Sequence, residues 1–277
     1  MALREQPEKP AAESFWKLHG LKGAFVNETS AQDAILSVSN KGEWDKNLSK
    51  LQSLFWPLIK EVYSRSDEEV ARQLEITFEN VDKVFIKTDG SKILGFLCIE
   101  KGAPKVAIIR DVIVRKEFQN SGIGKELYAS LFAEPEFDAV ISATTTLAAE
   151  INRFNVGNEN GFDSFYGTMG TGNPEVERLR ALDTDYLAKT DVLSEDQSLL
   201  PSDSSGFVLT KGDYIPRLES AEVTELRERA RKQSIPRQIV EQADKILGLQ
   251  RDLDEKLGKN KAPVVAGHLI SIRRQNE

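Results

Sequence analysis

Hydrophobic residues recur at helical spacing in two early segments of the chain. The first stripe comprises Leu48, Leu51, Leu54, Phe55, Leu58, Ile59 and Val62. Spacings of three and four predict an amphipathic helix, which Pro57 is expected to kink or divide. Ser66 followed three residues later by Glu69 is a capping-box pattern, so a second helix is expected to begin at Asp67.

From Val81 the hydrophobic period changes from helical to two, which is typical of strands. Two β-rich runs flank Asp89-Gly90, a favoured tight-turn pair, and predict a hairpin over residues 82–102. The run at 105–114 is apolar on both faces, so we expect a central strand there. A helix from Gly122, a strand at 137–146 and a helix at 147–156 follow. Before the first stripe, the pattern predicts a short strand at 23–29 and a short helix at 30–38.

Beyond Phe162 the hydrophobic pattern weakens, and residues 170–206 are rich in Gly, Ser, Asp and Pro around one predicted helix at 174–189. A strand is expected at 206–215 and amphipathic helices from residue 221 onward. The stripe of the last helix is Ile235, Ile239, Ala243, Ile246, Leu249, Leu253 and Leu257. We therefore divide the chain into a flexible leader (1–20), a main domain (21–212) with an insertion at 170–206, and a helical C-terminal extension (213–277).

The composition of the 277-residue chain excludes several classes of site. A net charge of −7 argues against a nucleic-acid binder, because phosphate binding needs a concentrated basic face. Cys98 is the only cysteine, so no intrachain disulfide can form, and the two histidines, His19 and His268, are too far apart in sequence to suggest a metal site. No signal peptide and no membrane-spanning run are evident, so we expect a cytoplasmic protein without a membrane partner.

A glycine-rich stretch lies between the expected central strand and the helix that follows it. It reads Gln119-Asn120-Ser121-Gly122-Ile123-Gly124, with Lys125 directly after it. The first amides of a helix lack internal partners and carry the positive end of the helix dipole, so they bind anions. Glycines there let a diphosphate approach the backbone. The alternative is a glycine-rich turn that serves only helix–strand packing.

With its flanking strand and helix, this stretch resembles motif A of the GNAT acetyltransferases, Q/R-x-x-G-x-G/A. The resemblance covers residues 81–168 and includes a helix that ends in Asn160-Gly161-Phe162. It implies an α/β (α+β) fold with a mixed, mostly antiparallel sheet flanked by helices, here with a helical C-terminal addition. It also implies acetyl-coenzyme A as the acyl donor, its diphosphate on the Gln119–Lys125 loop and its pantetheine arm beside Ile113 and Val114.

The resemblance implies transfer of an acetyl group to a primary amine by direct attack in a ternary complex, so a base must take the proton of the amine. Asp111 lies inside the apolar strand, and a desolvated carboxylate takes up a proton more readily, which makes it the first candidate. An Asp that pairs with a neighbouring Arg or caps backbone at a bulge is the alternative. Glu100, at the end of the hairpin, is the second candidate.

The family's thiolate-protonating tyrosine has no counterpart at the expected position, which falls near Gly157. Its usual helix-start asparagine falls near Glu150, with Asn152 close by. Tyr166 is the remaining candidate acid, with a core or rim tyrosine as the alternative. The gap keeps open a second function: a non-catalytic acyl-coenzyme-binding or interaction module of the same fold.

The acceptor is expected to be a small-molecule or peptide amine, and the insertion at 170–206 is expected to border its site. The C-terminal helices are nearly neutral and amphipathic. Such a pair packs on its own domain, on a second subunit in a homodimer, or on a different protein.

Overall fold

The computed structural model describes residues 21, 26–28, 33–37, 41–63, 66–79, 81–144, 147–190, 192–211, 217–232, 237–259 and 261–275. The predicted leader lies outside them. In the first part, the elements are β1 (Val26–Glu28), β2 (Asp33–Ser37), α2 (Lys41–Tyr63), α3 (Asp67–Glu79), β3 (Lys83–Thr88), β4 (Ile93–Ala103), β5 (Val106–Val114), α4 (Ile123–Ala133), β6 (Ala139–Thr144), α5 (Leu147–Glu159) and β7 (Phe162–Tyr166). The second part contains α6 (Pro174–Lys189), β8 (Phe207–Thr210), α7 (Ser220–Lys232), α8 (Arg237–Leu257) and β9 (Val264–Arg273).

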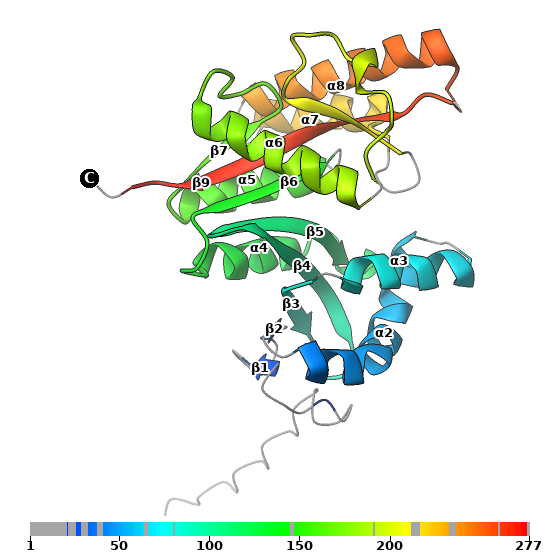
Figure 1. Cartoon of the computed structure of the whole chain (residues 1–277), viewed down its shortest axis with the longest axis vertical. Coiled ribbons are helices and arrows are strands. Elements are labelled where there is room, and N and C mark those ends of the chain that lie inside the picture. The colour runs from blue at the N-terminus through cyan, green and yellow to red at the C-terminus, as the bar shows by residue number, and fades with distance from the viewer. Residues whose placement is uncertain are drawn as a thin grey trace, which may run out of the picture.

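The described strands form one mixed sheet in the order β1-β2-β3-β4-β5-β6-β9-β7, with β8 also paired to β9. Every neighbouring pair is antiparallel except β5 and β6, which run parallel. This is the mixed, mostly antiparallel sheet with flanking helices that the sequence predicts. In Figure 1, α6 crosses the front of the sheet and α4 and α5 lie behind it.

Local sequence signals account for the elements of the first half. Ser66 and Glu69 form the predicted reciprocal cap, with the Ser66 amide donating to Glu69 Oε2 at 2.8 Å and the Glu69 amide to Ser66 Oγ at 3.3 Å. Asp89 Oδ1 accepts from the amides of Ser91 and Lys92 and closes the hairpin turn between β3 and β4. Pro57 lies within α2 and does not divide it.

The expected short helix at 30–38 is wrong. Residues 33–37 form β2, which pairs antiparallel with β3 in the register Asp33↔Lys87 to Ser37↔Lys83. Strand pairing with a neighbour far along the chain overrides the weak local preference of such a short segment.

Helices pack on both faces of the sheet. On one face, α2 and α3 cover β3 and β4 around the ring contacts of Phe55, Phe78 and Phe96. On the same face α6 covers β6 and β9, whereas α4 and α5 pack on the opposite face. The apolar stripe of α8 packs with α7 and α5 on Tyr166, Leu209 and Leu269. The C-terminal helices therefore bury their stripe against their own domain, and a contact with a second subunit stays a prediction.

The C-terminal addition ends in a strand, which the sequence prediction of a helical extension did not contain. Val264–Arg273 forms β9, which lies between β6 and β7 inside the sheet. The strand expected at 206–215 is shorter, Phe207–Thr210, and pairs with the first half of β9. One interior strand of the sheet is thus supplied by the C-terminal addition.

β7 and β8 lie end to end along one edge of β9 and meet opposite His268. The Gly167 amide donates to the His268 carbonyl at 2.9 Å, and the His268 amide donates to the Gly206 carbonyl at 3.0 Å. A Cβ on Gly206 would lie 2.0 Å from the Gly167 oxygen, so the junction needs glycine. The segment 168–205 therefore leaves and re-enters the sheet at a single point, and we call it the excursion.

Candidate active site

A β-bulge in β5 turns two consecutive charged side chains toward one face of the sheet. The register between β4 and β5 shifts from Cys98↔Asp111 to Ile99↔Ile109, which leaves Arg110 as the extra residue. Asp111 contacts α3, and Arg110 lies under α6, on the same face. A regular strand would have pointed these neighbours to opposite faces.

β5 and β6 separate next to this bulge. They pair only from Val106↔Ala139 to Ile108↔Ile141, although both strands continue further, and they diverge in Figure 1. Residues 109–112 are only half-buried even though β5 is central in the sheet. The backbone edge of a central strand is therefore open to an added extended chain at this separation.

The predicted phosphate loop lies at the end of β5. Gly122 takes a left-handed conformation (φ 98°) and is the N-cap of α4, and no side chain caps this helix end. The first helical bond runs from the Glu126 amide to the Gly122 oxygen at 3.0 Å, so the three amides between them lie outside the helix ladder. Gln119 to Gly122 are exposed. The arrangement matches an anion site at a helix N-terminus.

The backbone around the loop is equally open. A Cβ on Gly124 would meet only Asn152 Nδ2 at 3.9 Å and Val114 Cγ2 at 4.0 Å, which are ordinary contacts. The Arg115 amide donates to the Leu94 carbonyl on β4. Because backbone groups alternate along a strand, those of Val114 face the opposite edge of β5. There the Gln119 side chain donates to the Val114 carbonyl at 3.2 Å.

The remaining predicted loop residues differ in their surroundings. Lys125 pairs with Glu159 at 3.1 Å across the ends of α4 and α5, and the Ser121 hydroxyl donates to the Phe118 carbonyl. Ile123 is buried. Ile113 points into the core under α2, so only its backbone lies near the open edge of β5.

Asp111 is held from α3. Its Oδ2 accepts from Thr77 Oγ1 at 2.9 Å and from Gln73 Nε2 at 3.1 Å. Both donors come from one helical face, four residues apart, and neither was singled out by the sequence analysis. Asp111 is half-buried, and these two neutral donors fix its carboxylate beside the bulge.

Glu100 and Arg110 form a second group under α6. Arg110 Nη1 donates to Glu100 Oε2 at 3.1 Å, and its guanidinium lies 5.8 Å from the ring centre of Tyr186. Burial raises the pKa of Glu100 above its usual value, against the opposing effect of Arg110. Burial likewise raises the pKa of Tyr186, which therefore stays protonated at neutral pH.

Residues 47–147 match the model of the acetyltransferase (GNAT) family. Over these residues the chain is similar to the GNAT family. The match spans 101 of the 277 residues, from within α2 to the first residue of α5, and includes the bulge, the strand separation and the glycine loop. The predicted resemblance is confirmed, and a family of acetyltransferases indicates an acyltransferase.

Solved structures include several distant likenesses. A diaminobutyrate acetyltransferase from Paenibacillus lautus, in complex with L-2,4-diaminobutyric acid and coenzyme A, has 15% identity and a TM-score of 0.34, over 42% of this chain and 75% of that chain. An IAA acetyltransferase from Bacillus cereus has 18% identity and a TM-score of 0.30, over 40% of this chain and 71% of that chain. A GNAT acetyltransferase from Elizabethkingia anophelis with acetyl-CoA bound has 15% identity and a TM-score of 0.29, over 43% of this chain and 76% of that chain. No curated protein matches the chain.

The position of the usual GNAT tyrosine has no room for one. A Cβ on Gly157 would lie 2.9 Å from Ser164 Oγ and 3.3 Å from a ring carbon of Phe132. Tyr166, the predicted substitute, is fully buried in the core between β9 and α8. Its ring packs on Gly267, where a Cβ would lie 2.5 Å from it. The structure therefore places Tyr166 in the core and does not bring it to the bulge.

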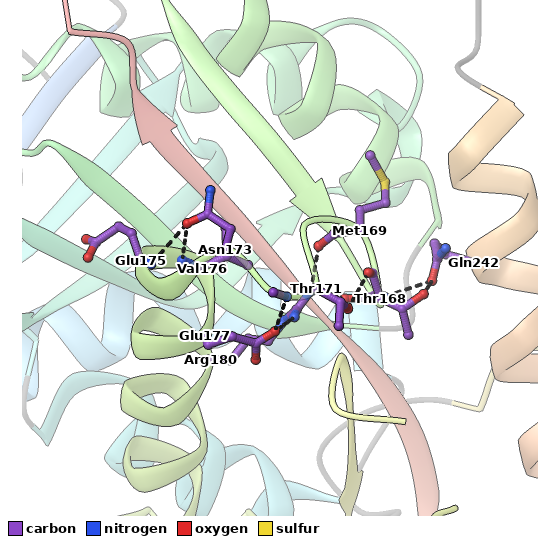
Figure 2. Close-up of polar contacts among 11 residues, drawn as sticks. Thr168, Met169, Thr171, Asn173, Glu175, Val176, Glu177, Arg180 and Gln242 are labelled. Atoms are coloured by element: carbon purple, nitrogen blue, oxygen red, sulfur yellow. Dashed lines mark hydrogen bonds and ion pairs between the residues drawn. The ribbon is translucent and has the colours of Figure 1, made fainter. Parts of the chain in front are cut away.

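The excursion adds α6 to the GNAT framework and fixes it firmly. Figure 2 shows Asn173 capping α6, Arg180 reaching back to the Met169 carbonyl at 2.6 Å, and Gln242 of α8 accepting from the Thr168 amide at 2.9 Å. Deeper in the core, Asp183 Oδ2 lies 2.7 Å from His268 Nδ1, and both side chains are 1% exposed. These contacts set the position of Tyr186 over the bulge.

No cluster of metal-ligating side chains occurs among the described residues. In the same part of the chain, no helix is both long and apolar enough to cross a membrane.

Proposed function

We propose that this protein is an acetyl-coenzyme A-dependent N-acetyltransferase that acts on a primary amine by direct attack in a ternary complex. The observation that carries the proposal is the uncapped N-terminus of α4 behind Gly122, directly beside the separation of β5 and β6. A diphosphate on the free amides and an extended arm along the edge of β5 would deliver a thioester to the bulge.

Asp111 is the base in this proposal. A primary amine is protonated at neutral pH and attacks only after it loses a proton. Asp111 lies at the bulge with its carboxylate oriented by Thr77 and Gln73, on the face opposite α4 and α5. Glu100 is the second base candidate, since its raised pKa suits proton uptake. Backbone amides of β5 near the bulge would stabilise the oxyanion.

The acceptor is a small-molecule or peptide amine, and charge supports this class. Two carboxylates, Asp111 and Glu100, face the side of the sheet between α3 and α6, with Arg110 paired to the second. An incoming ammonium group is attracted to such a surface.

Isothermal titration with acetyl-coenzyme A tests the loop assignment. Gly124→Leu places a side chain where only ordinary contacts exist, so the protein folds while the space beside the free amides is filled. We expect the affinity to fall by about 100-fold, or roughly 2.7 kcal/mol. Gly248→Leu in α8, where a Cβ meets no atom within 4 Å, is the matched control and retains affinity. Equal binding by both variants overturns the proposal.

A non-catalytic acyl-coenzyme-binding module is the second candidate. The crowding around Gly157 favours it, because the GNAT acid cannot be placed there. Consumption of acetyl-coenzyme A in the presence of a panel of amines separates the two functions. Tight binding with no amine-dependent consumption supports the module.

A further inference from the structure

A buried serine and arginine lie where β5 and β6 separate. Ser142 is the first residue of β6 beyond its last pair with β5, Ile108↔Ile141. Arg153 of α5 donates from Nη1 to Ser142 Oγ, and from Nη2 to the carbonyls of Val140 and Leu269. Ser142 is 9% exposed and Arg153 1% exposed. This contact lies on the α4–α5 face, from which the thioester would enter.

The bond from Arg153 determines the role left to the serine. A hydroxyl has one proton to donate and lone pairs that accept. Because the Arg153 guanidinium donates to Ser142 Oγ, the serine oxygen is the acceptor in this bond. The hydroxyl proton of Ser142 takes no part in it. No described residue accepts the hydroxyl proton of Ser142. Within the described part of the chain, the Ser142 hydroxyl is thus an unused hydrogen-bond donor at the mouth of the strand separation.

The proposed reaction needs a donor at this place. When the C–S bond of the thioester breaks, its electron pair moves to sulfur, and a preorganised donor stabilises that charge. The position that provides the acid in other GNAT proteins is closed here by Ser164 and Phe132 around Gly157, and Tyr166 lies in the core.

We propose that Ser142 donates a hydrogen bond to the departing sulfur and that Arg153 is the positioning residue that keeps its hydroxyl turned to the strand separation. The inference rests on the proposed acetyl transfer. The amine nitrogen bonds to the carbonyl carbon and gives its proton to the base, while the sulfur leaves as a thiolate bonded by Ser142 and takes a proton from solvent on release.

Steady-state kinetics of Ser142→Ala test the role in turnover. We expect kcat to fall by about 10- to 100-fold while the Kd of acetyl-coenzyme A stays within about twofold. Ser142→Thr keeps the hydroxyl and restores most of the activity. Ser164→Ala removes another buried hydroxyl of the same sheet, one that is bonded to Ser271 Oγ at 2.9 Å, and leaves kcat unchanged. An unchanged kcat in Ser142→Ala overturns the inference, as does an equal loss in Ser164→Ala.

Titration with coenzyme A itself gives a readout that a purely structural serine does not move. Because the hydroxyl favours the thiolate, wild-type protein is expected to release protons on binding coenzyme A near pH 8, and Ser142→Ala to release fewer. Equal release by both proteins contradicts the role of Ser142 even if no amine is acetylated. If the wild-type protein acetylates an amine and Ser142→Ala has the same kcat, only this inference is refuted. If the wild-type protein binds acetyl-coenzyme A but acetylates no amine, the proposed transferase function is refuted.

Discussion

The two sides of the β5–β6 separation are built in opposite ways. The side proposed to bind the coenzyme, here the coenzyme side, comes from consecutive residues, since the end of β5, the loop and the start of α4 follow one another from Val114 to Gly124. The side proposed to bind the acceptor, here the acceptor side, brings together α3, the β5 bulge and α6, whose contributing residues Thr77, Asp111 and Tyr186 are far apart in sequence. A site made from one short stretch needs only local geometry, whereas the second exists only when the sheet and the excursion are assembled.

The two sides also differ in how firmly they are held. The loop at Gly122 is exposed and its helix end is uncapped. By contrast, α6 is anchored by the buried Asp183–His268 pair, by Arg180 and by Gln242. We infer that the coenzyme side is shaped by its ligand and that the acceptor side is preformed.

Asp111→Asn should have the largest effect on the acceptor side. The amide keeps the size of the side chain but cannot take a proton, so kcat/KM for the amine falls by about 100-fold or more. The affinity for acetyl-coenzyme A is expected to be unchanged, because the Asp111 carboxylate is bonded to α3, on the face of the sheet opposite α4. Stopped-time thioester assays and calorimetry measure the two quantities, and a parallel loss of both contradicts the separation of the two sides.

Asp183→Ala should destabilise the excursion and with it the acceptor side. Removing one partner of a buried pair leaves His268 Nδ1 without its acceptor, and we expect unfolding to become easier by about 3 kcal/mol in denaturant titrations. Asp185→Ala, on the exposed face of the same helix, is the control and should be neutral. Equal stability of the two variants would show that the pair does not anchor α6.

Tyr186→Phe tests whether α6 touches the acceptor. The ring stays over Arg110, but the hydroxyl, which no described residue bonds, is lost. We expect the KM of the amine to rise by about fivefold, as for loss of one hydrogen bond, with kcat and coenzyme affinity unchanged. A change in coenzyme affinity would place Tyr186 on the other side.

Glu100→Gln gives the smallest effect, and it depends on pH. Because burial raises the pKa of Glu100 in the folded protein, its contribution to stability is present below the usual value of 4.5 and is lost as pH rises through the raised pKa. The stability of Glu100→Gln relative to wild type should therefore increase as the pH rises above 4.5. Thermal unfolding at several pH values checks this, and a constant difference would contradict it.

Local signals explain which parts of the fold were predictable. The capping box at Ser66, the Asp89-Gly90 turn, the apolar run of β5 and the glycines before α4 each act within a few residues, so their consequences can be read from the chain. The α6 boundaries are of this kind too, because Asn173 before Pro174 is a strong helix start. The apolar run at 264–272, which the predicted helical extension includes, is a strand signal of the same sort.

Tertiary structure alone decided the rest. A bulge depends on the register between two strands, so the sequence named Asp111 as a base but could not show that Arg110 shares its face. Its partners Thr77 and Gln73, the link between Ser142 and Arg153, and the position of Tyr186 over the bulge all join distant segments. The sequence by itself determined the proposed coenzyme loop, because binding an anion at a helix end needs only neighbouring residues. The acceptor side was settled by folding, because its residues meet only through long-range strand pairing.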